Sequence, residues 1–290
     1  MSGAGPNPPA PLYPLLYEPI VRRALEEDLG LAGDLTSDAV LPVGLKAEAA
    51  VVVRAAGRMA GLPAALSAFT LLDPTLEVEH HLADGEDAVQ GQTAATVRGS
   101  ARSILSAERT ALNLLGRLCG IATITRDLVA LVAPYGAHVV CTRKTTPGLR
   151  VLEKYAVRCG GARNHRFGLD DAVLIKDNHV ALAGGIRSAL ERARQRVGHL
   201  VKIELEVDSL DQLEEALSLG VDVVLLDNMP VETLREAVKM AKGRAITEAS
   251  GGITPATAAA IAATGVDLLS VGWLTHSAPA LDVALDVVGV

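Results

Sequence analysis

Residues 221–272 read VDVVLLDNMPVETLREAVKMAKGRAITEASGGITPATAAAIAATGVDLLSVG. Short runs rich in Val, Leu and Ile alternate here with longer segments in which the apolar residues recur at helical spacing. Short apolar runs predict buried strands, and their alternation with amphipathic helices is typical of a parallel sheet. The stretch therefore predicts an α/β fold.

The same alternation extends back to about residue 138. Strands are predicted at 138–141, 173–176, 201–206, 223–227, 245–248 and 268–271, with helices between them that include 210–219, 231–241 and 255–263. A closed or nearly closed barrel is favoured over a doubly wound open sheet, because no G-x-G-x-x-G motif follows the first strand. Lys202, Glu204 and Glu206 also share one face of a predicted strand, and the lumen of a barrel suits such a face.

The preceding part of the chain, residues 17–120, has a mixed character. A helix is predicted near 19–27, and short strand-like runs follow at 47–54, 76–81 and 92–98. Glycine-rich turns separate these runs, which indicates a small α+β domain with an antiparallel sheet. A long helix at 104–132 leads from this domain into a catalytic barrel domain at 121–276. The Pro- and Gly-rich residues 1–16 are expected to be a flexible tail.

The composition excludes several classes of protein. Of 290 residues 49% are apolar, so a large core can form, whereas only 2% are aromatic, too few for a single-stranded nucleic-acid platform. The net charge of −7 argues against general binding of nucleic acid. No apolar run approaches the roughly 20 residues of a membrane span. The three cysteines form no C-x-x-C pair and are predicted to be small core residues. No signal peptide is recognised at the N-terminus, and the protein is expected to be cytoplasmic.

Basic residues are concentrated around the first two barrel strands. Between residues 143 and 176 there are eight Lys and Arg residues but only three acidic ones. Arg binds carboxylate or phosphate through a bidentate fork, and Lys contributes a point charge. Because reactive groups of α/β barrels lie at the carboxyl ends of strands, Arg143, Lys144 and Lys176 predict a site for a ligand with several negative charges.

Two further groups follow the later strands. Ser250, Gly251, Gly252 and Gly272 are small residues whose backbone N–H groups can approach a phosphate closely. Carboxylates at Glu206 and Asp227 lie opposite the basic wall in the expected lumen, where they can hold Mg²⁺ or accept hydrogen bonds from ribose hydroxyls.

Several of these charged residues can also have a purely structural role. Arg150, Lys154 and Arg158 can form the solvated face of a helix, and Lys176 can be buried in an ion pair with Glu204 or Glu206. The pair His80–His81 lacks nearby ligands and is not expected to bind metal.

Several motifs, in order along the chain, resemble nicotinate-nucleotide pyrophosphorylase (carboxylating), also called quinolinate phosphoribosyltransferase. They are GDLT at 33–36, ERTALN at 108–113, TRKTTPG at 142–148, EKYAV at 153–157, HR at 165–166, LIKDNH at 174–179, VLLDN at 224–228 and EASGGIT at 248–254. The resemblance covers almost the whole chain from about residue 17.

The resemblance implies an α/β-hammerhead N-terminal domain, an incomplete α/β barrel and a last helix near 277–290 that packs back on the first domain. It also implies the reaction: quinolinate and 5-phosphoribosyl 1-diphosphate, with Mg²⁺, give nicotinate mononucleotide, pyrophosphate and carbon dioxide in NAD biosynthesis. The expected assembly is a homodimer with shared active sites, and neither nucleic acid nor a membrane is an expected partner.

Roles for individual residues are likewise implied by the resemblance. Arg109 would come from the partner subunit, and Lys144 would contact the ribosyl donor. The quinolinate carboxylates would be bound by Arg143, His165, Arg166 and Lys176. Glu206 and Asp227 would hold ribose hydroxyls and Mg²⁺, and with Lys144 they are the candidate catalytic residues. The 5-phosphate would be bound by Ser250, Gly251, Gly252 and Gly272.

Three alternatives remain at this point. A related pyrophosphorylase-like protein that accompanies molybdate transport shares the R-K-T and H-R motifs, but it lacks the Lys176–His179 run. A Schiff-base aldolase on a barrel would use Lys176 as its nucleophile. A sensor of phosphorylated metabolites would keep the pocket without the chemistry.

Overall fold

The computed structural model describes residues 9–289, which fall into two compact units. The first unit comprises residues 9–126, 145–161 and 273–289, and the second comprises 127–144 and 162–272. The chain thus leaves the first unit and returns to it twice. The first unit also contains residues 121–126, 145–161 and 273–276, which the sequence assigns to the barrel domain.

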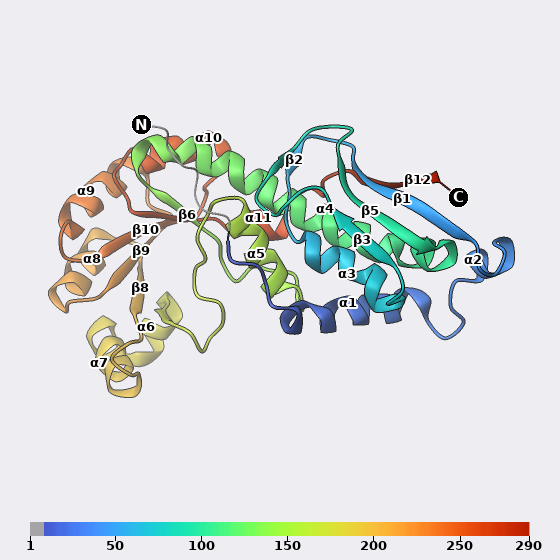
Figure 1. Cartoon of the computed structure of the whole chain (residues 1–290). Helices are drawn as coiled ribbons and strands as arrows, with labels where there is room; N and C mark the ends of the chain where they lie inside the picture. The colour runs from blue at the N-terminus through green and yellow to red at the C-terminus, as the bar shows by residue number, and fades with distance from the viewer. Residues whose placement is uncertain (1–8, 290) are drawn as a thin grey trace. The chain divides into compact units, whose positions relative to one another are not determined.

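The first unit begins with helices and a small antiparallel sheet (Figure 1). Its elements up to residue 100 are α1 Pro14–Leu29, α2 Leu35–Val40, β1 Lys46–Val53, β2 Gly57–Arg58, α3 Leu62–Leu72, β3 Glu77–His80, β4 Asp87–Ala88 and β5 Thr93–Ser100. The GDLT motif has a local structural cause: the Asp34 carboxylate accepts hydrogen bonds from the backbone N–H groups of Thr36 and Ser37 and so caps α2. Since α1 begins at Pro14, the last residues of the predicted tail are helical, and residues 1–8 of that tail lie outside the described part.

The end of the chain is a strand, so the prediction of a last helix near 277–290 is wrong. β12, Val283–Gly289, pairs antiparallel with β1, and the sheet has the order β12-β1-β5-β3. The packing back on the first unit is therefore achieved by hydrogen bonding along the edge of β1. Val-rich sequence favours this extended conformation, and an edge strand supplies the backbone partners.

Three helices complete the first unit. α4 spans Ala101–Val132 and belongs to this unit up to residue 126, α5 spans Arg150–Cys159, and α11 spans Trp273–His276. Gly116 and Gly120 of α4 face the backbone of residues 279–281, where a Cβ on Gly120 would collide with the carbonyl group of Pro279. Glycine is needed at this position because it alone allows the two backbones to approach so closely.

The second unit contains a six-stranded parallel sheet with helices on its outer side (Figure 1). Its strands are β6 His138–Val140, β7 Val173–Ile175, β8 Ile203–Val207, β9 Val223–Asp227, β10 Ile246–Ser250 and β11 Leu268–Ser270. The helices between them are α6 Asp177–Ala183, α7 Ile186–Arg196, α8 Leu210–Ser218, α9 Val231–Ala241 and α10 Pro255–Ala262.

The strand order identifies the sheet as an incomplete barrel. Neighbouring strands run β6-β11-β10-β9-β8-β7, so β7 to β11 follow one another in chain order and β6 lies beside β11. A doubly wound sheet would reverse its order at a switch point, and this sheet does not. β6 and β7 are its two edges, so the predicted α/β fold with an incomplete barrel is confirmed.

The cores consist mainly of small aliphatic side chains, as the scarcity of aromatic residues requires. All three cysteines are buried and reduced, which confirms their prediction as core residues. None of the helices within residues 9–289 has an apolar stretch long enough to cross a bilayer.

Candidate active site

A cavity of about 370 Å³ opens at the carboxyl ends of the strands in the second unit. Residues two apart on a strand face the same side of the sheet, so Leu225 and Asp227 of β9, and Glu248 and Ser250 of β10, share the lumen face. The lining residues are Thr142, Arg143, Lys144, His165, Arg166, Leu174, Lys176, Glu206, Leu225, Asp227, Glu248, Ser250 and Ser270. Eight of the twelve predicted site residues are among them, brought together from segments far apart in the sequence.

The cationic side of the cavity is formed by two arginines. The Nε atom of Arg143 is buried and has no hydrogen-bond partner. Arg166 donates a hydrogen bond to the carbonyl oxygen of Ala172 at 3.1 Å. Burial, together with the nearby charge of Arg143, lowers the pKa of Arg166 from its ordinary value. Two guanidinium groups held this close favour a bound anion, because an anion relieves both their repulsion and their desolvation.

Lys176 and Glu206 form an ion pair at the mouth of the cavity, with Nζ 2.7 Å from Oε2. The lysine side chain is 48% exposed, so this is not the fully buried pair of the structural explanation. The backbone N–H of Lys176 donates to Nδ1 of His179 at 2.9 Å, which fixes the start of α6. The Lys-Asp-Asn-His run therefore positions the lysine.

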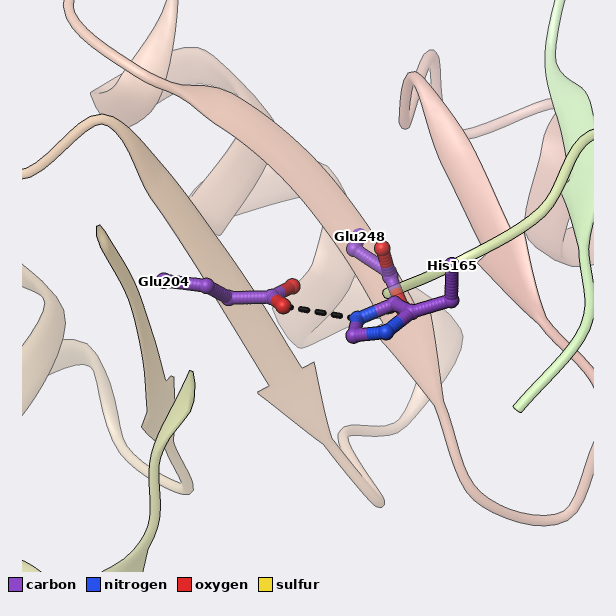
Figure 2. A group of neighbouring side chains, drawn as sticks. All are labelled: His165, Glu204 and Glu248. Atoms are coloured by element: carbon purple, nitrogen blue, oxygen red, sulfur yellow. Dashed lines mark hydrogen bonds and ion pairs between the residues drawn. The ribbon is translucent and has the colours of Figure 1, made fainter. Parts of the chain in front are cut away.

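His165 contacts two buried carboxylates (Figure 2). Its Nε2 atom lies 2.7 Å from Oε2 of Glu204 and 3.6 Å from Oε1 of Glu248. Burial and the neighbouring charge of Glu204 raise the pKa of Glu248 to about 7. Each of the three side chains offers one nitrogen or oxygen atom of a kind that binds metal ions, and these three atoms lie within 4.8 Å of one another.

The turn after β9 is locked to the turn after β10. Asn228 adopts a left-handed backbone conformation with φ 54°. Its backbone N–H donates a hydrogen bond to the Ser250 carbonyl oxygen at 2.8 Å. Its side-chain Nδ2 donates a second hydrogen bond to Oδ2 of Asp227 at 2.7 Å. A side chain on Gly251, whose φ is 87°, would collide with the Asn228 amide. Asp227 and the Ser250–Gly252 turn are therefore held in one arrangement.

Four predicted site residues do not line this cavity. Gly251 and Gly252 follow Ser250 in the turn after β10, and Gly272 follows β11 by two residues. Arg109 lies on α4 of the first unit, where its side chain is 64% exposed beside a hollow that also contains Asp28, Asp34 and Ser106.

Two expectations about lysines are wrong. Lys202 precedes β8 and does not face the lumen, because its exposed side chain pairs with Asp222, with Nζ 2.6 Å from Oδ1. Lys154 is fully buried and not part of a solvated helix face. Its neighbour Glu153 is also fully buried and accepts hydrogen bonds from Arg117 at 2.9 Å and from the backbone N–H of Thr146 at 3.0 Å.

The sequence predicts no functional role for the site's buried acids. It places Glu204 on the lumen face, as one possible ion-pair partner of Lys176, and Glu248 at the end of the predicted strand 245–248. The available signal is a carboxylate within a predicted strand, two residues before Glu206 and Ser250 respectively and therefore on the same face as these residues. Such a residue must find a partner in the interior, since an unpaired buried charge is costly.

Family models match nearly the whole described chain. The model of the quinolinate phosphoribosyl transferase N-terminal domain matches residues 34–119, and that of the C-terminal domain matches residues 121–286. Among named relatives, the probable nicotinate-nucleotide pyrophosphorylase (carboxylating) of Bacillus subtilis is 46% identical over 261 residues, covering 90% of each chain. The nicotinate-nucleotide pyrophosphorylase (carboxylating) of Mycobacterium leprae is 45% identical over 92% of this chain and 95% of its own.

Solved structures are similar over the same extent. NadC from Streptococcus pyogenes superposes with a TM-score of 0.93 at 37% identity, covering 97% of this chain and 100% of the other. The nicotinate-nucleotide pyrophosphorylase from Francisella tularensis gives a TM-score of 0.92 at 38% identity, covering 96% and 98%. The chain therefore belongs to the quinolinate phosphoribosyltransferase family, the decarboxylating phosphoribosyltransferases of NAD biosynthesis.

Proposed function

We propose that the cavity of the second unit is the site at which quinolinate is joined to ribose 5-phosphate. The observation that carries this proposal is the gathering of Arg143, Arg166 and Lys176 in one cavity of an otherwise acidic protein, opposite Glu206 and Asp227. A small diacid beside a sugar phosphate needs this combination of cationic and carboxylate walls.

The cavity divides into regions of different chemistry. Arg143, His165, Arg166 and Lys176 bind the two carboxylates of quinolinate, and Lys144 contacts the diphosphate of the donor. Ser250, Gly251, Gly252 and Gly272 receive the 5-phosphate at the ends of β10 and β11, where backbone N–H groups of turns suit an anion. The hydrogen bond from the backbone N–H of Asn228 to the Ser250 carbonyl oxygen keeps this turn preorganised before the donor arrives.

The residues present fit a magnesium ion. Glu206 and Asp227 line the main cavity and also a neighbouring hollow of about 260 Å³ that Asp177 and Asp208 share. Carboxylate oxygens are the ligands that Mg²⁺ prefers, and one or two of them suffice when phosphate oxygens supply the rest. When bound, Mg²⁺ neutralises charge on the departing pyrophosphate.

The reaction needs positioning and neutralisation, and no side chain has to act as a nucleophile. The quinolinate nitrogen forms a bond to the anomeric carbon while the bond to pyrophosphate breaks, and that leaving group takes the electron pair. Lys144 stabilises the departing oxygen. The bond to the adjacent carboxylate then breaks, carbon dioxide leaves, and the ring carbon takes up a proton. The cationic pyridinium stabilises the intervening carbanion.

The proposal also includes the oligomeric state and the cellular location of the protein. Two copies form a dimer in which Arg109 of one subunit reaches the cavity of the other, and nucleic acid and membranes are not partners. The proposed location is the cytoplasm; the names of the tobacco relatives place two of those proteins in mitochondria.

The decisive test is turnover by the purified chain of quinolinate with 5-phosphoribosyl 1-diphosphate and Mg²⁺. Carbon dioxide and nicotinate mononucleotide are expected in equal amounts, and neither is expected when the ribosyl donor is omitted. A covalent adduct trapped by borohydride would instead favour an aldolase that uses Lys176. The lysine of a Schiff-base aldolase must be an uncharged amine to attack its substrate. The ion pair between Lys176 and Glu206 favours the charged form of Lys176 and so argues against this alternative.

A further inference from the structure

The edge strand β6 is paired, on the side away from β11, with a short segment that leads into the cavity. Val140 of β6 forms a parallel bridge with Arg163. The backbone N–H of Arg163 donates to the Val139 carbonyl oxygen at 2.9 Å, and its carbonyl oxygen accepts from the N–H of Cys141 at 3.2 Å. Hydrogen bonds of this pattern join neighbouring parallel strands. The chain around Arg163 therefore continues the sheet beyond β6.

This pairing brings two arginines into the cavity side by side. Arg143 lies three residues after Val140, and Arg166 lies three residues after Arg163, the bridge partner of Val140. Both arginines line the cavity, and burial followed by the charge of Arg143 lowers the pKa of Arg166. Because two guanidinium groups repel each other, their spacing must be held by the segments that carry them.

A side-chain contact strengthens the pairing one residue beyond the bridge. The thiol of Cys141 donates a hydrogen bond to Oδ1 of Asn164, with 3.3 Å between sulfur and oxygen. A thiol is a weak donor, but Cys141 is completely buried and Asn164 is half-buried, so water competes little for the contact. Each of the two residues lies two positions before an arginine of the cavity. The proposed roles of the cavity residues use neither of them.

The remaining part of the loop that carries Arg166 is restrained from within. The backbone N–H of Phe167 donates to Oδ2 of Asp171 at 2.5 Å, and Arg166 donates to the carbonyl oxygen of Ala172 at 3.1 Å. These contacts shape the loop, but they do not fix its place beside β6. The pairing of Arg163 and the contact of Asn164, by contrast, join the loop to the end of β6.

We propose that Asn164 is a positioning residue, which through Cys141 holds Arg166 at a fixed spacing from Arg143, so that both arginines engage one diacid at the same time. Once the first carboxylate is bound, the second meets its arginine at a high effective concentration. A monoacid engages one arginine and gains nothing from the spacing. That the diacid is quinolinate rests on the proposed function, whereas the spacing of the arginines does not.

Binding of two simple aromatic acids to the purified chain tests this proposal without turnover. Benzene-1,2-dicarboxylate is the diacid probe and benzoate is the monoacid probe, and titration calorimetry measures both. In Asn164→Ala the Kd of the diacid should rise about fivefold, the scale of one lost hydrogen bond, whereas the Kd of benzoate should change less than about twofold. A general loss of structure would weaken both acids alike and leave the ratio of the two Kd values unchanged.

Variants of Cys141 show whether the contact itself is responsible. Cys141→Ala should reproduce the loss seen in Asn164→Ala, and the double variant should lose no more than either single variant, because one contact can be lost only once. Cys141→Ser keeps a donor and should stay within about twofold of wild type. Gln195→Ala, at an exposed position on α7, is the control for loss of an amide. Additive losses in the double variant, or an unchanged ratio in Asn164→Ala, would overturn the proposal.

Amide hydrogen exchange tests the attachment of the loop without any ligand. The N–H groups of Cys141 and Arg163 form the pairing, so both should exchange about fivefold faster in Asn164→Ala and at the wild-type rate in Cys141→Ser. The N–H of Val224 on β9 is the internal control and should not change. Unchanged exchange at Cys141 and Arg163 in Asn164→Ala contradicts the positioning role. If the chain does not turn over quinolinate, the proposed function fails while the exchange rates still decide about Asn164.

Discussion

Arg143 combines a central place in the cavity with a buried Nε that has no hydrogen-bond partner. A guanidinium in this state is poised to gain a partner, and a substrate carboxylate supplies one without a large change in structure. Charge-assisted hydrogen bonds of this kind are stronger than hydrogen bonds between neutral groups, particularly where the groups are largely withdrawn from water. The residue is therefore the one through which we expect most of the discrimination for a diacid.

Arg143→Ala is expected to raise the KM for quinolinate and to cost about 2–5 kcal/mol in kcat/KM, the scale for removing one partner of a buried charge pair. Steady-state kinetics with quinolinate varied at a saturating ribosyl donor measures this loss. Arg158→Ala, at an exposed position on α5, is the control and should have little effect. Activity of Arg143→Ala within twofold of wild type would exclude the assigned role.

Among the elements, α4 approaches the backbone near Pro279 most tightly at Gly120. Gly120→Ala places a methyl group against a backbone carbonyl, which cannot move away as a side chain can. The free energy of unfolding should fall by about 2 kcal/mol or more, the scale of overpacking. Urea denaturation measures this change.

Gly198→Ala is the matched control for Gly120→Ala, because nothing lies within 4 Å of the Cβ that it would add. Its unfolding midpoint should equal that of wild type or exceed it slightly, since alanine restricts the unfolded chain more than glycine. Equal unfolding midpoints for the two variants would show that the contact with Pro279 adjusts to the added methyl group without loss of stability.

The short strand β4 is held by an ionic contact whose strength depends on pH. Hydrogen bonds from Arg58 and Arg126 lower the pKa of Asp87 from 3.8 to about 2. Because the pKa is lower in the folded state, the carboxylate stabilises the fold above pH 3.8, and this contribution is lost as the pH falls towards 2.

Asp87→Asn should therefore lower the urea midpoint by a constant amount between about pH 5 and pH 7, and by progressively less below pH 4. Most of the Asp87 side chain is exposed, so the effect should be modest. Glu77→Gln, at an exposed carboxylate on β3, is the control. A difference between wild type and Asp87→Asn that does not change with pH would show that the loss comes from packing.

For the whole molecule, the proposed dimer with shared active sites leads to a quantitative prediction. Arg109→Ala and Arg143→Ala chains should each form inactive dimers, but a hybrid of the two contains one intact site: the Arg143 cavity of the first chain with Arg109 from the second. Random exchange makes half of the dimers hybrid, so the mixture should recover about a quarter of wild-type activity.

This recovery is measured after the two variants are unfolded together in urea and refolded. Separately refolded and then briefly mixed variants are the control and should remain inactive. If Arg109 acted within its own chain, no combination of the two variants would restore a complete site, and the mixture would stay inactive.

The sequence by itself determined most of the elements of the second unit and the location of the candidate site. Strand 223–227 and helix 231–241 follow from local periodicity, and the Arg143–Lys144 pair follows from its place after a strand, because these signals need only near neighbours. The strand at 283–289 did not follow, since its conformation depends on the free edge of β1, more than 200 residues away.

The tertiary structure alone decided which charges are buried and which of them meet. Lys202 and Glu204 look alike as members of one alternating face, yet one is paired at the surface and the other lies beneath His165. Lys154 lies on a helix whose charge pattern suggests solvent, but it is covered completely. Burial and pairing depend on strand register and on segments distant along the chain, and that information is not local to any stretch of sequence.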